Sequence, residues 1–186
     1  MQRLNQNFFQ LFDLPESFYL DVDNLSAKYR DMQTEVHPDK FAAAPEQEKM
    51  HAVQMTSYIN EAYSTLKSPI KRAAYILSLQ GMDTESVNQN DLGMDLLTEQ
   101  MQLRESLDEL PKDESALPEL DRLKKDVKER LSLKQNGFAC EIEQGEYVCA
   151  KKIFHELQFL HKLLPVSYTH LRAHETRHDL VCRLLL

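Results

Sequence analysis

Apolar residues recur at intervals of three or four along most of the chain, and this spacing is the strongest constraint on its fold. The clearest case is the stripe Leu25, Tyr29, Met32 and Val36, which would lie on one face of a helix beginning at Asp21. Pro38 ends the helix before His37, because proline disfavours helical backbone in the residue before it. The chain has only 4 glycines, which argues against tight hairpins and glycine-rich phosphate loops. The pattern therefore predicts an all-α protein.

Three further helices are expected in the first half of the chain. Asn7 is placed to cap a short helix, and Pro45 suits the first turn of a longer one. Ser68 followed by Pro69 is typical of a cap and first turn, and Gly81 would end the helix that follows. The apolar positions expected in these three helices are, in chain order, Phe8, Phe9, Leu11 and Phe12; Met50, Val53, Ile59, Ala62, Tyr63 and Leu66; and Ala73, Ile76, Leu77 and Leu79.

The second half of the chain is expected to form a separate helical domain. Residues 82–91 are polar and poor in apolar side chains, which is typical of a linker. Three more helical segments follow, over 92–110, 113–135 and 145–164. Pro111 would separate the first two, and the Asn136-Gly137 turn the last two. The expected organisation is a first domain over 1–81, the linker, an antiparallel three-helix bundle over 92–164, and a tail over 165–186.

Composition excludes several classes of function. The net charge is −8, whereas nucleic-acid phosphates require a basic surface. The 3 cysteines form no C-x-x-C pair, so neither a disulfide framework nor a zinc clip is expected. No run of about 18 apolar residues is present, and the first residues lack the pattern of a secretory signal, so no membrane partner is expected and the cytoplasm is the expected location. No cofactor or resident metal is expected.

The tripeptide His37-Pro38-Asp39 is the most informative motif, because it would join two amphipathic helices. Pro38 fixes one backbone torsion, so its neighbours lose less entropy on binding a partner. Asp39 offers a carboxylate to a bidentate arginine, and His37 a ring that can hydrogen-bond on two sides. A basic patch beside this loop is expected from Lys28, Arg30 and Lys40. The plainer reading is a helix stop with two solvated polar side chains.

A helical hairpin that presents this tripeptide resembles a J-domain, and the chain resembles one J-domain family, HscB, in particular. The segments that carry the resemblance in the first domain are Leu11-Phe12-Asp13-Leu14-Pro15, His37-Pro38-Asp39-Lys40-Phe41-Ala42, Ile59-Asn60-Glu61-Ala62-Tyr63, Leu66, Pro69 and Arg72-Ala73-Ala74-Tyr75. The resemblance continues beyond the linker, in Glu99-Gln100-Met101-Gln102-Leu103-Arg104-Glu105, Leu107-Asp108-Glu109, Phe159-Leu160 and Lys162-Leu163. It implies a co-chaperone without a catalytic centre, whose loop and preceding helix contact an HscA/DnaK-type chaperone and accelerate its ATP hydrolysis.

The same resemblance implies a second binding site. In the HscB family the C-terminal bundle binds the scaffold protein IscU, on which iron–sulfur clusters are assembled. Carried over by position, the client-binding residues are Leu97, Thr98, Met101, Gln102, Glu105, Glu109 and Phe159. The family often has Met at position 98 and Glu at position 102, so these two positions depart from its pattern. The plainer reading buries Leu97 and Met101 in the bundle core.

The tail after Pro165 departs from the acidic, leucine-rich end of the family and is interpreted as a non-native extension. It places His170, His174, His178 and Cys182 at four-residue intervals, which on a helix could form a soft-metal site. Two alternatives to the leading hypothesis follow. One is a J-domain co-chaperone for a different client, and the other is a metal-binding or redox protein that uses these side chains.

Overall fold

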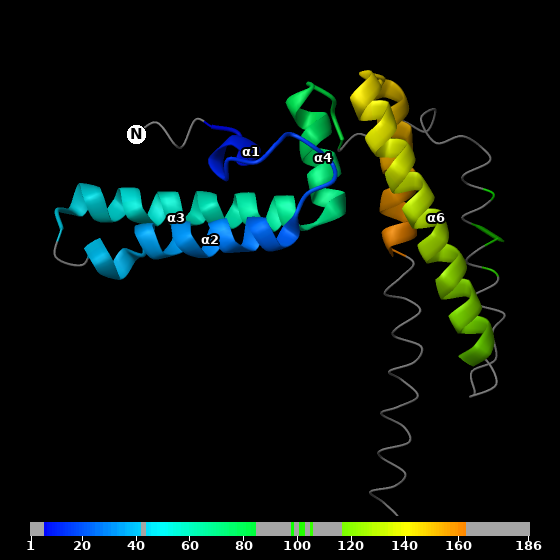
Figure 1. Ribbon diagram of the computed structural model, residues 1–186, viewed down its shortest axis with the longest axis horizontal. Coiled ribbons are helices and arrows are strands. Elements are labelled where there is room, and N and C mark those ends of the chain that lie inside the picture. The colour runs from blue at the N-terminus through cyan, green and yellow to red at the C-terminus, as the bar shows by residue number, and fades with distance from the viewer. Residues whose placement is uncertain are drawn as a thin grey trace, which may run out of the picture. The chain divides into compact units, whose positions relative to one another are not determined.

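The computed structural model describes residues 6–41, 44–84, 98, 101–102, 105 and 117–162. Every regular element among these residues is a helix, in agreement with the predicted all-α class (Figure 1). The chain divides into two compact units, Met1–Met82 and Asp83–Leu186.

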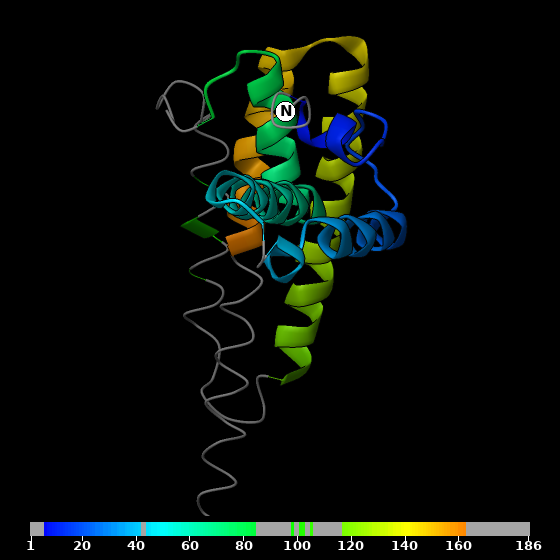
Figure 2. The same ribbon diagram turned by 90° about the vertical axis from the view of Figure 1, so that its left-hand side faces the viewer.

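A long helical hairpin forms most of the first unit. Its elements are α1 (Phe8–Leu11), α2 (Val22–Val36), the short 3₁₀-helix η2 (Pro38–Phe41), α3 (Glu46–Lys67) and α4 (Pro69–Leu79). Helices α2 and α3 lie side by side in both views, joined at one end by η2 and the loop after it (Figures 1 and 2). Helix α1 packs against α3, and α4 continues the chain after a sharp turn at Ser68.

The predicted helix caps are confirmed. The Asn7 side chain accepts a hydrogen bond from the Gln10 amide at 2.8 Å, and the Gln10 side chain accepts one from the Asn7 amide at 3.3 Å, which completes a capping box. Asp21 caps α2, and Ser68 caps α4 with proline in its first turn. These local signals explain why α1, α2 and α4 begin where the sequence predicts. Pro45, expected in the first turn of α3, instead precedes that helix as its N-cap, and no side-chain hydrogen bond caps it.

The apolar face of α3 is only partly the one predicted. Ile59, Ala62 and Leu66 are buried as expected, but Met50 and Val53 are 60% and 57% exposed, so their assignment to the core was wrong. The buried stripe instead runs through Ala52, Met55, Ile59, Ala62 and Leu66. This stripe follows a strict three–four spacing, and positions 50 and 53 fall outside it.

An arginine is part of the core of the first unit. Arg72 of α4 is only 5% exposed, and burial lowers the pKa of its guanidinium from the ordinary value. Its Nε donates to the Leu66 carbonyl at 2.8 Å, and a second guanidinium nitrogen donates to the Phe18 carbonyl. The guanidinium carbon also lies 5.7 Å from the centre of the Phe18 ring. Arg72 thereby joins the end of α3 to the segment between α1 and α2.

The second unit contains α6 (Leu117–Gln144) and a helix over 147–162 that runs alongside it (Figures 1 and 2). The predicted break at Asn136-Gly137 was wrong, because α6 continues through both residues. The chain turns instead at Gly145, whose φ of 78° is left-handed. Its amide donates to the Ile142 carbonyl and the Glu146 amide donates to the Glu141 carbonyl, the pattern of a Schellman cap.

Side-chain packing explains why α6 passes through the Asn-Gly dipeptide. Phe138 and Ala139, directly after it, are buried, and so are Phe154 and Leu157 on the following helix. A Cβ atom built on Gly137 would meet the Ile153 side chain at 3.6 Å, which is ordinary van der Waals contact. Tertiary burial therefore outweighs the local turn preference of the dipeptide.

Candidate functional site

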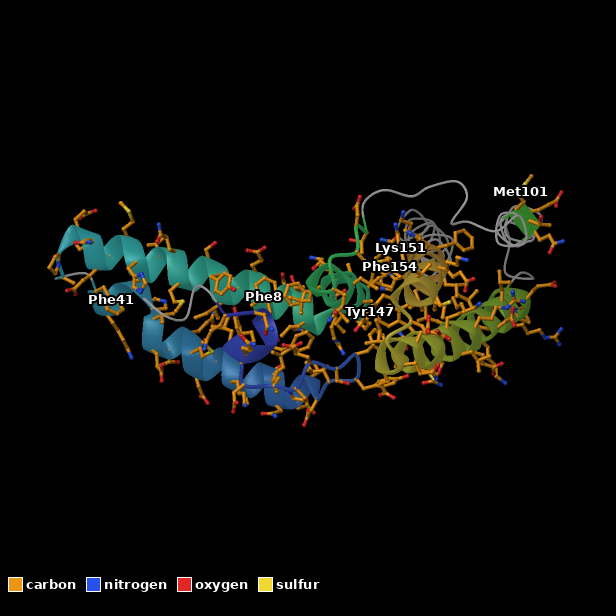
Figure 3. The ribbon with its side chains drawn as sticks, turned by 90° about the horizontal axis from the view of Figure 1, so that it is seen from above. Phe8, Phe41, Met101, Tyr147, Lys151 and Phe154 are labelled. Carbon is orange, nitrogen blue, oxygen red and sulfur yellow. The ribbon has the colours of Figure 1, made fainter. Side chains whose placement is uncertain are left out.

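The loop that carries His37-Pro38-Asp39 lies at the end of the α2–α3 hairpin (Figure 1). His37 leaves the helix with ψ of 127°, as expected for the residue before a proline. The chain then forms one 3₁₀ turn, in which the Lys40 amide donates to the His37 carbonyl at 3.0 Å. His37 and Lys40 are exposed, and the side chains of Pro38 and Asp39 lie outside the described ones. Figure 3 marks this end of the hairpin by Phe41, well away from Phe8 of α1.

Of the two basic residues of α2, Lys28 contacts another part of the first unit, whereas Arg30 is exposed. The Lys28 ammonium donates to the Asp13 carbonyl at 2.8 Å and lies 3.4 Å from the Asp13 carboxylate. Asp13 itself has a left-handed φ of 47°. Hydrogen bonds from Ser26 and Lys67 lower the pKa of Tyr63 on α3, and the charges of Lys67 and Arg30 lower it further. Along a helix, Lys28 is roughly 13 Å from His37, so a basic patch beside the loop rests on Lys40 more than on Lys28.

A row of polar contacts, here called the polar ladder, crosses the seam between α2 and α3. Its first rung is the Ser26–Tyr63 hydroxyl pair at 3.2 Å, and its second is the Tyr29 hydroxyl donating to Asn60 Oδ1 at 2.9 Å. Gln33 adds a third rung, because its amide donates to both the Tyr29 hydroxyl and Asn60. The Tyr29 and Tyr63 rings stack with centres 3.9 Å apart.

The last rung of the polar ladder lies at the end of α2, where the loop begins. Thr56 Oγ1 lies 3.3 Å from the carbonyl oxygen of Val36, the residue before His37. Sequence reasoning missed the polar ladder, since its residues are ordinary polar side chains whose pairing depends on the register of two helices.

The predicted client-binding residues are partly visible in the second unit. Thr98, Met101, Gln102 and Glu105 are helical and exposed, and Phe159 on the last helix is half-buried. Leu97 and Glu109 lie outside the described residues. Met101 is 72% exposed, so the interpretation that would bury it in the bundle core does not hold for this residue (Figure 3). An exposed thioether beside polar side chains suits a docking surface.

The helix that carries Phe159 is held firmly against α6. Its residues Phe154 and Leu157 are completely buried, and Glu156 forms an ion pair with Lys134 of α6. His155 is also buried, and neither of its ring nitrogens has a hydrogen-bond partner among the described residues. No group of three or more potential metal ligands occurs among the described residues, and the His170–Cys182 series lies outside them. Among the described helices we find none that combines the length and the hydrophobicity of a membrane-spanning segment.

Comparisons with known proteins agree with this division into two units. Residues 7–75 match the DnaJ domain, and residues 92–165 match the HSCB C-terminal oligomerisation domain. A co-chaperone protein HscB homologue from Paraburkholderia phymatum is 37% identical over 163 residues, which cover 88% of this chain and 93% of the relative. The chain belongs to the HscB family of co-chaperones.

Solved structures of the HscB family share the fold of this chain. Chaperone HscB from Vibrio cholerae superposes with a TM-score of 0.81 at 34% identity, covering 92% of this chain and 99% of the other. Human co-chaperone protein HscB superposes with a TM-score of 0.81 at 25% identity, covering 89% and 82%. The resemblance inferred from the sequence motifs is thereby confirmed, together with the J-domain and the C-terminal helical domain of the HscB fold.

Proposed function

We propose that this chain is a two-site adaptor of iron–sulfur cluster biogenesis. Its J-domain loop would dock on an HscA/DnaK-type chaperone and stimulate ATP hydrolysis, while its second unit would bind an IscU-type scaffold protein. The observation that carries the proposal is the combination of a J-domain and an HscB C-terminal domain on one chain, with the His37-Pro38-Asp39 loop at the hairpin end. The cytoplasm is the proposed location.

The form of the loop suits docking rather than catalysis. A proline and a 3₁₀ turn restrict its backbone before any partner arrives, which lowers the entropy lost on binding. His37 and Lys40 stand exposed on it, where a chaperone could contact them. Stimulation would then arise because the chaperone conformation competent for hydrolysis binds the loop more tightly than the resting one. The chain itself would contribute no catalytic group and no cofactor.

The proposed client surface combines an apolar anchor with charge. Met101 and Glu105 lie one helical turn apart and are both exposed, so they share a face. The well-packed helix over 147–162 would present Phe159 as a second anchor. Interfaces of this kind take most of their binding energy from a few apolar or aromatic side chains.

A reconstituted system tests the proposal directly. ATP hydrolysis by an HscA-type chaperone is measured in single turnovers with this chain alone, with an IscU-type scaffold alone, and with both. We expect stimulation by the chain alone and further stimulation when the scaffold is added. A chain that stimulates the chaperone but does not bind the scaffold would instead be a J-domain co-chaperone for a different client.

Replacing both Met101 and Phe159 with alanine should weaken scaffold binding without affecting chaperone stimulation in the absence of client. The expected loss is about 2 kcal/mol, or roughly thirtyfold in Kd, because two apolar anchors are removed. Isothermal titration calorimetry with the scaffold measures it. The matched control is Leu133→Ala, since Leu133 is a 69% exposed apolar residue of the same unit outside the proposed surface. Equal losses in the control and the double variant would contradict the assignment.

Deleting residues 166–186 should change neither ATPase stimulation nor scaffold binding, because the proposed sites lie before this segment. Both assays are run on the shortened chain, and circular dichroism checks its helix content. If the shortened chain keeps its fold but loses scaffold binding, the tail is functional, and its histidines and Cys182 become candidates for the client site.

A further inference from the structure

The carbonyl of Val36 is held from the opposite helix. Val36 is the last residue of α2, so its carbonyl is one of the four at a helix C-terminus that lack a partner within the helix. Thr56 Oγ1 on α3 lies 3.3 Å from this oxygen and 2.8 Å from the Ala52 carbonyl of its own helix. A hydroxyl carries one proton, which these two carbonyls share. The contact therefore fixes the position of the last α2 carbonyl relative to α3, and with it the point at which the chain leaves α2 for the loop.

The neighbouring rung restrains the same end of α2 one turn earlier. Gln33 precedes His37 by four residues, so the two positions lie on one helical face. Its amide reaches both the Tyr29 hydroxyl and Asn60 of α3, the latter at 3.2 Å. Asn60 in turn precedes Tyr63 and follows Thr56 by one turn on α3. The polar ladder thus extends without a gap from the base of the hairpin to the loop.

The hairpin does not depend on this last rung for its stability. Ile59, Ala62 and Leu66 of α3 are completely buried, and so is Leu25 of α2, and these contacts hold the two helices together. Thr56 is only half-buried, so water could replace its hydroxyl at the Val36 carbonyl after a substitution. Loss of the Thr56 hydroxyl would instead increase the conformational freedom of the segment from His37 to Phe41.

We infer that Thr56 is a positioning residue, which holds His37 and the 3₁₀ turn after it in the orientation that the chaperone binds. This inference rests on the proposed function, because it assumes that the loop is the docking element. A loop that samples more orientations binds with lower apparent affinity, since only the competent fraction docks. Once docked, it stimulates as the wild type does. Loss of the Thr56 hydroxyl therefore raises the co-chaperone concentration needed for half-maximal stimulation and leaves the maximal rate unchanged.

The test compares three variants of the full chain. Thr56→Val keeps the shape of the side chain and removes the hydroxyl. Thr56→Ser keeps the hydroxyl and removes only the methyl group. Ser26→Ala removes a rung at the opposite end of the polar ladder and serves as the matched control. We expect Thr56→Val to raise the half-maximal concentration about fivefold, the effect of one lost hydrogen bond, while Thr56→Ser and Ser26→Ala stay within about twofold of wild type. An unchanged half-maximal concentration for Thr56→Val, or an equal rise for Ser26→Ala, overturns the inference.

Amide hydrogen exchange tests the role of Thr56 independently of the proposed function. The Lys40 amide donates to the His37 carbonyl in the 3₁₀ turn, so its exchange rate reports the order of the loop without any chaperone. We expect faster exchange of the Lys40 amide in Thr56→Val than in Thr56→Ser or wild type. If wild type does not stimulate the chaperone, the proposed function fails, and the exchange rates still decide whether Thr56 orders the loop. Equal exchange rates in all variants overturn the positioning role.

Discussion

The variant His37→Gln is expected to keep the helical hairpin and to stimulate the chaperone ATPase at least tenfold less than wild type. Position 37 is exposed at the C-terminal cap of α2, so the substitution removes little buried surface and leaves helix content unchanged. The imidazole can hydrogen-bond on two sides, and glutamine does not reproduce the ring geometry. A tenfold loss corresponds to about 1.4 kcal/mol, and the loss of one residue at an interface hot spot costs about 2 kcal/mol or more. Single-turnover ATP hydrolysis measures the loss, and circular dichroism measures the fold.

The matched control for this variant is His161→Gln. His161 is an exposed histidine on the helix over 147–162 in the second unit, so the same chemical change is made outside the loop. The control is expected to stimulate at the wild-type level when no client is present. The companion variant Asp39→Asn keeps the size of the side chain, removes its charge and is expected to behave like His37→Gln. Wild-type stimulation by either loop variant would show that the chaperone docks elsewhere.

The sequence predicts most of the first-unit fold because the signals that place its helices are local. Asn7, Asp21 and Ser68 each accept a hydrogen bond from an amide two or three residues later, and the structure contains all three caps. Pro38 ends α2 for an equally local reason. Such signals involve neighbours in the chain, so they can be read without knowledge of the tertiary structure.

The wrong predictions concern features that depend on tertiary packing. Met50 and Val53 are apolar and have helical spacing, yet the face of α3 that meets α1 and α2 passes through Ala52 and Met55. The Asn136-Gly137 dipeptide favours a turn by itself, but burial of Phe138 and its neighbours keeps α6 helical there. In both cases a contact with a distant segment decides between two locally acceptable structures.

Prediction of the candidate site from the sequence has the same limit, because contacts between distant segments are not visible in it. The sequence identifies the loop, because its tripeptide and flanking helices are visible in order. It does not reveal that Lys28 binds Asp13, since the contact requires the left-handed turn between α1 and α2. Nor does it reveal the polar ladder, whose members are 20 to 37 residues apart in the chain. Pairings across an antiparallel hairpin become visible only when the register of its helices is known.

Replacing Arg72 with methionine is expected to lower the stability of the first unit by about 3 kcal/mol. Methionine keeps much of the length of the side chain but donates no hydrogen bond, so the carbonyls of Leu66 and Phe18 lose their donors in a buried setting. Hydrogen bonds from a charged group contribute about 1.5–3 kcal/mol each, and relief of the buried charge offsets part of this loss. For a unit of this size the melting temperature should fall by roughly 15 °C. Thermal unfolding of the full chain, followed by circular dichroism, measures the change.

The neighbouring variant Lys71→Met controls for the change in charge. Lys71 lies on the same helix and is exposed, so its replacement should shift the melting temperature by no more than about 2 °C. If the two variants unfold at the same temperature, the guanidinium is dispensable, and Arg72 does not hold α4 to the hairpin.

The Arg72→Met variant also separates stability from docking. Leu66 lies in the last turn of α3 and the loop precedes its first turn, so roughly 30 Å of helix lie between the lost contacts and His37. Below its melting temperature the variant should therefore stimulate the chaperone ATPase as wild type does, in contrast to His37→Gln, whose stimulation should be at least tenfold lower at every temperature. Loss of stimulation while the hairpin is still folded would mean that the order of the loop depends on the far end of α3. The amide exchange of Lys40 would then rise in Arg72→Met as well as in Thr56→Val.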